Sequence, residues 1–285
     1  LFLTLIFIQN FNTFNTLTNQ FTKEKYIDVA KSIKESDSKL LTKLPSFVVR
    51  LISKIVKEKQ INELLNKYSD DIGGDFLKNI LKELNITLDI EGLENLPKNE
   101  KCFFTSNHPF GIIDGLILTA IVSQKYGHLK AIANDAFDYI PHLKPFIISV
   151  NVYGKSSKEH ITALEKTYQS NVPITHFPAG AVSRIINGKI QDDVWKKSFV
   201  KKAKQHKRDI VPFYIHGKNS NLFYSVYRIR KWLGISQNIE LVLLPGEMFK
   251  KKNKIIKISI GNLITHSSLD KRASDSEWAQ KIRNQ

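Results

Sequence analysis

The sequence has little cysteine and no apolar run long enough to cross a bilayer. Its single cysteine, Cys102, excludes a disulfide within the chain and favours a reducing compartment. The opening eight residues are apolar but far shorter than the roughly 20 that a spanning helix needs, and they lack the basic flank of a signal peptide. The run at 112–122 is interrupted by Asp114 and is expected in the core. These features predict a cytoplasmic protein without a spanning segment.

The motifs of several enzyme classes are also absent. There is no Gly-x-Ser-x-Gly elbow of a hydrolase, no Gly-x4-Gly-Lys-Ser/Thr phosphate loop and no Gly-x-Gly-x-x-Gly dinucleotide fingerprint. The eight histidines are scattered and show no paired spacing of a metal site. We therefore expect neither a metal nor a bound cofactor.

Acidic residues are few relative to basic ones. The 285 residues include 43 Lys and Arg against 27 Asp and Glu, a net charge of +16. This surplus indicates an anionic partner, such as membrane lipid, a phosphorylated substrate, an acidic carrier protein or nucleic acid. An AT-biased genome produces the same surplus, so charge alone does not choose among them. Near the Lys-rich stretch 196–208, Trp195 and Phe199 fit the buried side of a helix, which disfavours nucleic-acid binding.

The sequence divides into three parts. Residues 1–24 are apolar and then rich in Asn and Thr, and are expected to be poorly ordered. Residues 25–85 hold apolar stripes at helical spacing within 44–56, 61–68 and 76–84. They predict a helical extension that packs on the main domain or lies on a membrane, and the two can coexist.

Residues 86–285 form the third part, in which apolar runs alternate with helical segments such as 158–169 and 194–205. This alternation predicts a layered α/β fold with a mixed, largely parallel sheet. The expected strands are 87–91, 102–105, 129–133, 148–152, 174–177, 210–215 and 255–260.

The chain is organised around residues 107–114, Asn-His-Pro-Phe-Gly-Ile-Ile-Asp, between an expected strand and an expected helix. In a continuous helix, residues six positions apart point to different sides. Pro109 and Gly111 argue against a continuous helix, so a bend can bring His108 and Asp114 together. Asp114 would then bind the proton of one imidazole nitrogen and leave the other as a base. Alternatively, Asp114 caps the next helix and the histidine is structural.

This stretch resembles the first block of the lysophospholipid and glycerol-phosphate acyltransferase superfamily, and most of all its bacterial hemolysin-like branch. In the wider superfamily four residues separate the catalytic His and Asp. Here five do, with Pro directly after His108, a form that looks like the branch's own. The resemblance implies an acyltransferase domain with His108 as general base and Asp114 as its partner. It also implies Asn107 and Gly111 at the substrate site.

Residues 177–184, Phe-Pro-Ala-Gly-Ala-Val-Ser-Arg, are similar to the third block, which holds the head group of the acceptor. The wider family has Glu where this chain has Ala179, and its Arg falls at Val182. Arg184 could still donate a pair of hydrogen bonds to a phosphate or carboxylate, or simply be solvated. The substrate-binding residues implied here are Phe177, Pro178, Gly180, Ser183 and Arg184.

Two other blocks lie on either side of the third block along the chain, in the order that the superfamily has them. Residues 151–158 stand at the place of the second block, where Lys155 could contact an anion or be solvated. Residues 211–213 resemble the fourth block, and Pro212 within a strand requires an edge or a bulge. Residues 217–220 look like another feature of the branch. There Lys218 and Asn219 could contact the phosphate of an acyl donor or cap a helix.

The resemblance implies transfer of a fatty acyl group from acyl carrier protein or coenzyme A to a hydroxyl of a lyso-lipid, without a covalent acyl-enzyme. The acceptor could be lysophosphatidate or a lyso-amino-acid lipid such as lyso-ornithine or lyso-glycine lipid. The missing Glu favours the second. A non-catalytic, hemolysin-like lipid-binding protein is the alternative, and an intact His-Asp pair disfavours it.

A lipid acceptor and the lack of a spanning segment predict peripheral attachment, on the inner face of the cytoplasmic membrane. The opening apolar run with the helix at 47–56 could supply it. So could a Lys-dense stretch that comprises Lys250, Lys251, Lys252, Lys254 and Lys257. The sequence does not indicate an oligomeric state.

Overall fold

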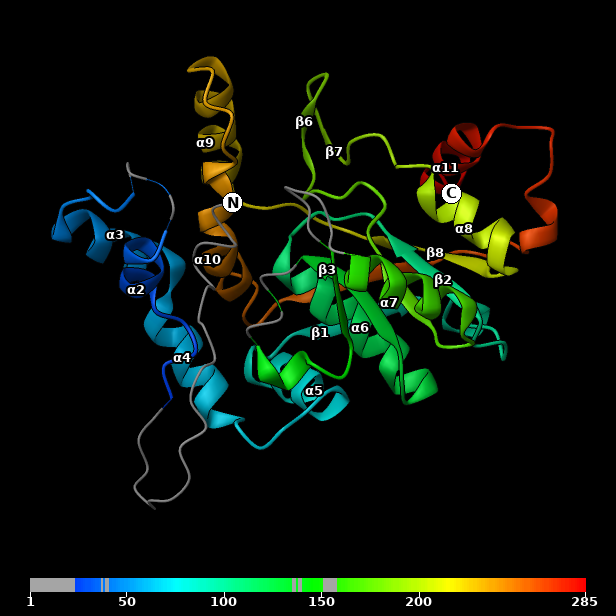
Figure 1. Cartoon of the computed structure of the whole chain (residues 1–285), viewed down its shortest axis with the longest axis horizontal. Helices are drawn as coiled ribbons and strands as arrows, with labels where there is room; N and C mark the ends of the chain where they lie inside the picture. The colour runs from blue at the N-terminus through cyan, green and yellow to red at the C-terminus, as the bar shows by residue number, and fades with distance from the viewer. Residues whose placement is uncertain (1–23, 37, 39–40, 135–136, 138–139, 151–157) are drawn as a thin grey trace.

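A seven-stranded sheet forms the centre of the computed structural model, which describes residues 24–36, 38, 41–134, 137, 140–150 and 158–285 (Figure 1). Each strand overlaps one of the predicted apolar runs. The strands are β1 (Thr87–Glu91), β2 (Cys102–Ser106), β3 (Lys130–Asn134), β4 (Ile147–Val150), β5 (Ile174–His176), β8 (Asp209–Ile215) and β9 (Ile255–Ile260). Residues 151–152, predicted in the fourth strand, lie outside the described residues.

The strand order across the sheet is β1-β9-β8-β2-β5-β3-β4. All neighbours run parallel except β8 and β9. The mixed, largely parallel sheet is therefore confirmed. Parallel strands cannot be joined by tight turns, so helices form the connections and cover the faces of the sheet.

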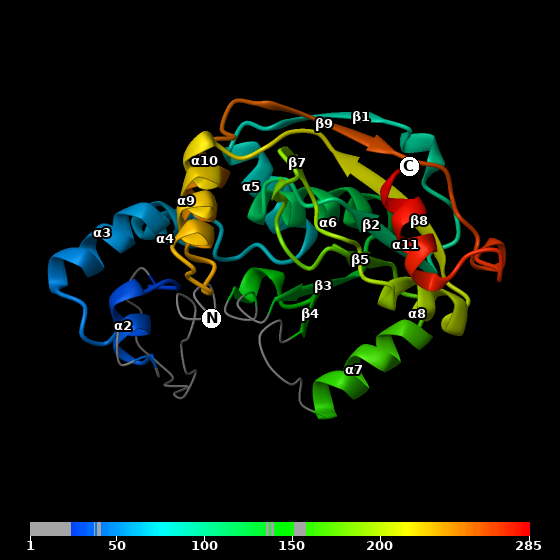
Figure 2. The same ribbon diagram turned by 90° about the horizontal axis from the view of Figure 1, so that it is seen from above.

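Helices flank the sheet and extend beyond one end of it. They are α2 (Val29–Lys34), α3 (Ser46–Val56), α4 (Glu58–Lys67), α5 (Gly74–Glu83), α6 (Ile112–Tyr126), α7 (Lys158–Gln169), α8 (Ser198–His206), α9 (Asn221–Trp232), α10 (Leu244–Phe249) and α11 (Asp275–Arg283), with 3-10 turns η3 (Pro141–Leu143) and η4 (Ile239–Leu243). Figure 2 shows α2, α3 and α4 on the opposite side of the molecule from α8 and α11. Within the described ranges, no helix combines the length and apolar character that crossing a bilayer requires.

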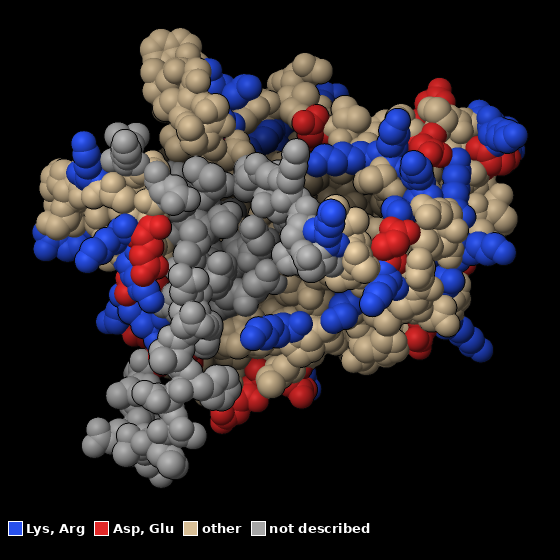
Figure 3. Space-filling view, in the orientation of Figure 1, with Lys and Arg blue, Asp and Glu red and all other residues tan. Residues whose placement is uncertain are grey.

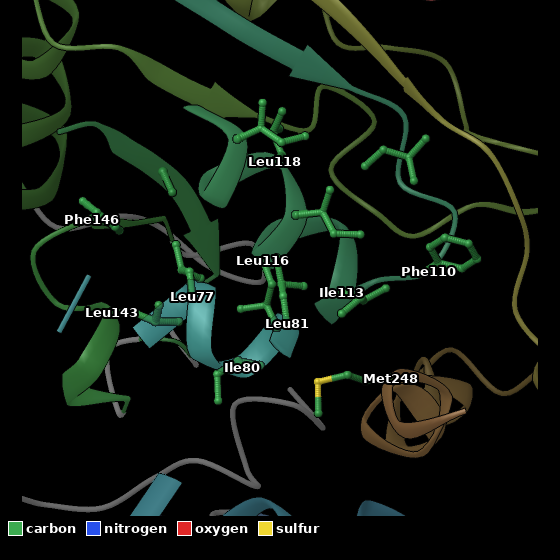
Figure 4. Close-up of a cluster of buried hydrophobic side chains, with 14 of the residues drawn as sticks. Leu77, Ile80, Leu81, Phe110, Ile113, Leu116, Leu118, Leu143, Phe146 and Met248 are labelled. Atoms are coloured by element: carbon green, nitrogen blue, oxygen red, sulfur yellow. The ribbon is translucent and has the colours of Figure 1, made fainter. Parts of the chain in front are cut away.

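The central strand β2 is buried along its whole length because it contributes to two hydrophobic clusters. Cys102 and Phe104 pack into the cluster that includes side chains of α5, α6 and α10. Figure 4 shows part of this cluster, with Leu77 of α5 near Leu116 of α6. Phe103 points to the opposite face, into a cluster with α8 and α11.

The N-terminal stripes form α3, α4 and α5, with α2 before them. Buried side chains from this segment, such as Val56, Ile61 and Phe76, belong to the same cluster as Phe104 of the sheet. The segment therefore packs on the main domain, where α5 contacts α6 and α3 contacts α10. Helix α3 nevertheless keeps exposed apolar side chains, with Phe47 65% accessible.

A two-stranded sheet is present that the sequence analysis does not include. β6 (Arg184–Ile186) and β7 (Lys189–Gln191) form an antiparallel hairpin. Asn187 and Gly188 at its tip have φ angles of 50° and 77°. Both values lie in the left-handed region that an Asn-Gly hairpin turn adopts, so this dipeptide is the sequence signal for the hairpin.

Helix α8 begins at Ser198 rather than at the predicted 194. The preceding residues are held in a non-helical path, since the Trp195 indole donates to Asp192 and the Lys196 amide donates to the Pro178 carbonyl. Trp195 is buried, as the helical stripe predicted.

Pro212 lies in β8, an interior strand of the sheet, and a bulge accommodates it. Ile210 pairs with Ile264, and Phe213 pairs with Ile260. Two β8 residues, 211 and 212, therefore face three partner residues, 261–263. This extra residue is the bulge that a proline inside a sheet requires.

Arg208 immediately precedes β8 and is completely buried. Its guanidinium donates hydrogen bonds to backbone carbonyls at the end of α7 and in the turn before β5. These carbonyls belong to Thr167, Tyr168, Ser170 and Val172. Burial lowers the pKa of Arg208 to about 10, so the group stays charged at neutral pH. It satisfies carbonyls that a helix end leaves free and joins α7 to the start of β8.

His142 of η3 links the N-terminal helices to the sheet. It is 2% exposed, and neither ring nitrogen has a hydrogen-bond partner among the described residues. Its ring stacks on Phe76 at 4.4 Å and lies 5.3 Å from the ring of Tyr26. Burial lowers the pKa of His142, because an imidazolium here would lose its hydration.

We expect stability to fall as the pH drops below about 6.5, where the unfolded chain protonates His142 and the folded chain does not. This group can contribute up to about 1.4 kcal/mol per pH unit. His142→Phe keeps a ring between Phe76 and Tyr26, so its urea midpoint should fall less between about pH 7.5 and 5.5 than that of the wild type. His128→Phe, at a histidine whose side chain is 53% exposed, serves as the control. Equal pH dependence in wild type and His142→Phe would contradict this assignment.

Candidate active site

Three of the sequence blocks meet at one edge of the sheet. β8, β2 and β5 are parallel neighbours, so their carboxyl ends, at Ile215, Ser106 and His176, lie side by side. The side chain of Asn107 continues the pairing of β2 with β8. Its Oδ1 accepts from the Ile215 amide at 2.7 Å, and its Nδ2 donates to the Ile215 carbonyl at 3.0 Å. Asn107 thereby fixes the first block against the end of β8.

His108 and Asp114 are in direct contact. His108 Nδ1 lies 3.0 Å from Asp114 Oδ2, and the same oxygen accepts the amides of Phe110 at 2.7 Å and Gly111 at 2.8 Å. Helix α6 begins at Ile112, so Asp114 stands in its first turn and reaches back over the predicted bend. Asp114 is not the N-cap, which is Gly111, but the third residue of the helix, and the same carboxylate oxygen closes the helix start and contacts the imidazole.

The environment of Asp114 orients the histidine. Asp114 is completely buried, and its second oxygen, Oδ1, has no hydrogen-bond partner in the described part of the chain. Burial raises the pKa of Asp114, while the His108 contact and the two amides oppose this rise. With the carboxylate ionised, Nδ1 of the neutral ring carries the hydrogen and Nε2 holds the lone pair.

Gly111 makes the bend possible. Its φ angle is 94°, which side chains rarely tolerate. A Cβ at this position would also lie 2.9 Å from the Leu244 side chain of α10. Any other residue here would shift the two amides that hold Asp114.

The third block packs on the other side of His108. The Phe177 ring stacks on the imidazole with a centroid separation of 4.1 Å and an interplanar angle of 26°. The Ser183 amide donates to the His108 carbonyl at 2.8 Å. The His108 side chain remains 18% exposed, so part of the ring is accessible to a substrate.

Asp192 is a site residue that the sequence analysis missed. It is 5% exposed, and its Oδ1 accepts the His108 amide at 3.1 Å and the Ser183 hydroxyl at 2.6 Å. Its Oδ2 accepts the Trp195 indole at 3.0 Å. The β6–β7 hairpin brings Asp192 back beside Ser183, so the Asn187-Gly188 turn was the only local signal for this contact.

Arg184, which was expected to contact an anionic substrate group, instead faces Glu240 of η4. Its Nη2 lies 3.0 Å from Glu240 Oε1, and its Nη1 donates to the Val182 carbonyl. Arg230 of α9 lies 2.8 Å from the other carboxylate oxygen of Glu240. The Arg184 side chain is only 11% exposed, and burial lowers its pKa.

Gly180 lies beside a cation that the sequence analysis did not single out. Its φ angle is 68°, and a Cβ there would come within 2.8 Å of Lys196 Nζ. Lys196 is exposed. Burial, together with the charge of Lys196, lowers the pKa of His176 to about 4. An ammonium group thus lies against the turn that follows Phe177.

Lys218 and Asn219 lie just before α9, as predicted. The start of this helix binds a carboxylate of the protein itself, that of Glu247. Glu247 of α10 accepts the Ser220 amide at 2.7 Å and its hydroxyl at 2.6 Å. Asn219 is buried and donates to the Phe110 carbonyl at 3.3 Å. Lys218 is exposed. Lys155 lies outside the described residues.

The structure therefore brings together His108, Asp114, Asn107, Gly111, Phe177, Pro178, Ser183 and Asn219. No group of His, Cys, Asp or Glu within the described ranges is arranged to hold a metal ion. The chemistry that this arrangement supports is proton transfer by a histidine with a fixed tautomer.

Comparison with known proteins agrees with these blocks. A family model described as Acyltransferase matches residues 31–285. Two relatives described as lyso-glycine lipid O-acyltransferase, from Bacteroides thetaiotaomicron and Phocaeicola vulgatus, are each 37% identical over 259 residues. The matches cover 90% of this chain and 95% and 93% of those proteins, respectively. A crystal structure of a 1-acyl-sn-glycerophosphate acyltransferase from Thermotoga maritima matches 84% of this chain and 90% of that one, with a TM-score of 0.43 and 15% identity. The family model and the two relatives confirm the resemblance of the sequence blocks, and the chain belongs to the acyltransferase family.

Proposed function

We propose that this protein transfers a fatty acyl group from a thioester to a hydroxyl of a lyso-glycine lipid. The names of the two relatives at 37% identity support this acceptor. So does Ala179, which replaces the Glu of the glycerol-phosphate branch. The observation that carries the proposal is the His108–Asp114 contact of 3.0 Å, with the ring partly exposed.

His108 is the general base in this proposal. Its Nε2 takes the proton of the acceptor hydroxyl as the oxygen attacks the thioester carbonyl. When the tetrahedral intermediate collapses, the carbon–sulfur bond breaks and the thiolate leaves. The imidazolium returns the proton to this thiolate, so the histidine ends in its starting form. Asp114 stabilises the imidazolium and keeps the ring in one tautomer.

The acyl donor in the proposal is acyl carrier protein or coenzyme A, which acts as a co-substrate. No bound cofactor is needed, because the thioester already carries the activated acyl group. The buried Cys102 does not form an acyl-enzyme, since burial raises the pKa of its thiol to about 12. The reaction takes place at the inner face of the cytoplasmic membrane, where the protein attaches peripherally.

His108→Ala should lower kcat by about 10²–10⁴, because it removes the base, while the two amides that still bind Asp114 keep the protein folded. Asp114→Asn should also lower kcat strongly, since the amide still offers an acceptor to the Gly111 amide but no charge to the imidazolium. Transfer of radiolabelled acyl groups to detergent-dispersed lyso-glycine lipid measures both. Near-wild-type turnover by folded His108→Ala protein would exclude His108 as the base.

Asp192→Asn tests whether the carboxylate positions the base. The asparagine has one acceptor oxygen for three donors, so its amide group must face either the His108 amide or the Trp195 indole. We expect a loss of about 1–3 kcal/mol of stability and a fall in kcat larger than the change in KM.

The neighbouring Asp193 is exposed, and Asp193→Asn is the matched control. An unchanged kcat for Asp192→Asn at a temperature where it is fully folded would limit Asp192 to a structural role.

A further inference from the structure

The outer face of α9 is apolar, and the described part of the chain leaves it exposed. Leu222, Ile229 and Leu233 are each 55% exposed, at positions that share one side of a helix, with the half-buried Val226 between them. Trp232, beside this stripe, is 84% exposed. Large apolar side chains gathered in this way indicate an interaction surface.

The inner face of the same helix is firmly held. Phe223 and Tyr224 are buried in a cluster with residues of η4. Arg230 shares the Glu240 carboxylate with Arg184 of the hairpin. Because the inner side is fixed by packing and ion pairs, α9 presents its outer side as a rigid surface.

The charges on α9 are all positive. No acidic residue occurs between 221 and 234, and Arg228 and Lys231 are exposed. Figure 1 shows α9 projecting from the body of the molecule. In Figure 3 its surface is mainly uncharged, with Lys or Arg side chains beside it. Apolar residues, a tryptophan and flanking cations are the features of a helix that lies in the interface of an anionic bilayer.

We propose that the face formed by Leu222, Ile229, Trp232 and Leu233 docks on an anionic lipid bilayer, with Arg228 and Lys231 at the head groups. This proposal rests on the proposed function, because the acceptor there is a membrane lipid. A second copy of the chain is a poorer occupant, since a twofold contact through this face would bring the same cations together.

The α9 face is connected to the His108 site through the residues that precede the helix. Asn219, two residues before α9, donates to the carbonyl of Phe110, which is two residues from His108. Docking through α9 therefore holds this edge of the sheet near the lipid surface from which the acceptor comes.

The Lys-dense stretch at 250–257 is a weaker candidate for this contact. Lys250 binds Glu247 at 2.6 Å, and Lys257 binds Glu91 at 2.6 Å. Lys251 donates to the Lys218 carbonyl and lies 4.1 Å from the Phe110 ring centroid. Three of its five ammonium groups thus have partners within the protein.

The test uses the full chain and vesicles of equal parts phosphatidylglycerol and phosphatidylcholine. Addition of vesicles should shift the tryptophan emission to shorter wavelength. Trp232→Phe should abolish this shift, because Trp195 is buried and Trp278 is half-buried on α11, away from α9 (Figure 2). The triple variant Leu222→Ser, Ile229→Ser, Leu233→Ser should bind the vesicles at least about tenfold more weakly. Its rate on detergent-dispersed lyso-glycine lipid should stay at the wild-type value.

Ile255→Ser is the matched control, since Ile255 is an apolar residue 73% exposed on β9. Arg228→Gln with Lys231→Gln should weaken binding to the anionic vesicles and leave binding to pure phosphatidylcholine unchanged. Wild-type binding by the triple variant, or no binding by the wild type, would overturn the proposal. So would a wild-type dimer that the triple variant converts to a monomer, since a second copy would then occupy the face. Vesicle binding without acyl transfer in detergent would instead refute the proposed function and leave the docking surface standing.

Discussion

A carboxylate that loses contact with water needs hydrogen-bond donors, and one oxygen of Asp114, Oδ2, has three of them within a single bend. Its donors are the imidazole of His108 and two amides from the three residues before α6. The bend cannot open without leaving a buried charge unpaired, which is costly in a protein interior. The start of α6, the turn and the orientation of the base are therefore one structural unit. Asn107 and Asn219 attach this unit to the end of β8 and to the segment before α9.

Much of this arrangement could be predicted from local signals. The alternation of short strand-like segments with helical ones located all seven strands of the main sheet. The signal is strongest for β2, which is buried on both faces and is continuously apolar at 102–104, and weaker for β1, whose residues alternate in exposure. The proline and glycine after His108 predicted the bend. The contact between Asp192 and the His108 amide could not be predicted in this way, because 84 positions separate the two residues. The same holds for Arg184, whose partner Glu240 lies in a 3-10 turn without a sequence signature.

The net positive charge does not by itself locate a binding surface for an anionic partner, because many of the cations are bound to groups within the protein. Arg208 is bound to backbone carbonyls inside the protein. Arg184 and Arg230 share one carboxylate, and Lys250 pairs with a buried one. These groups stabilise the fold and offer little to an anionic partner. The cations proposed to contact lipid, Arg228 and Lys231, differ from these because they lie beside exposed apolar side chains. The sequence alone does not make this distinction.

The burial of Arg208 also has a consequence for how the chain folds. Four of its acceptors precede it by 36 to 41 positions and lie in the last turn of α7 and in the segment between α7 and β5. A sheet assembled without them would enclose a charged guanidinium whose remaining acceptor is the Cys102 carbonyl at 3.4 Å, at a cost of several kcal/mol. The end of α7, the start of β5 and the start of β8 must therefore assemble together. During synthesis, the earlier strands β2 and β5 cannot complete their central sheet until β8 has left the ribosome. The site at the far edge of these strands consequently forms late and in one cooperative step.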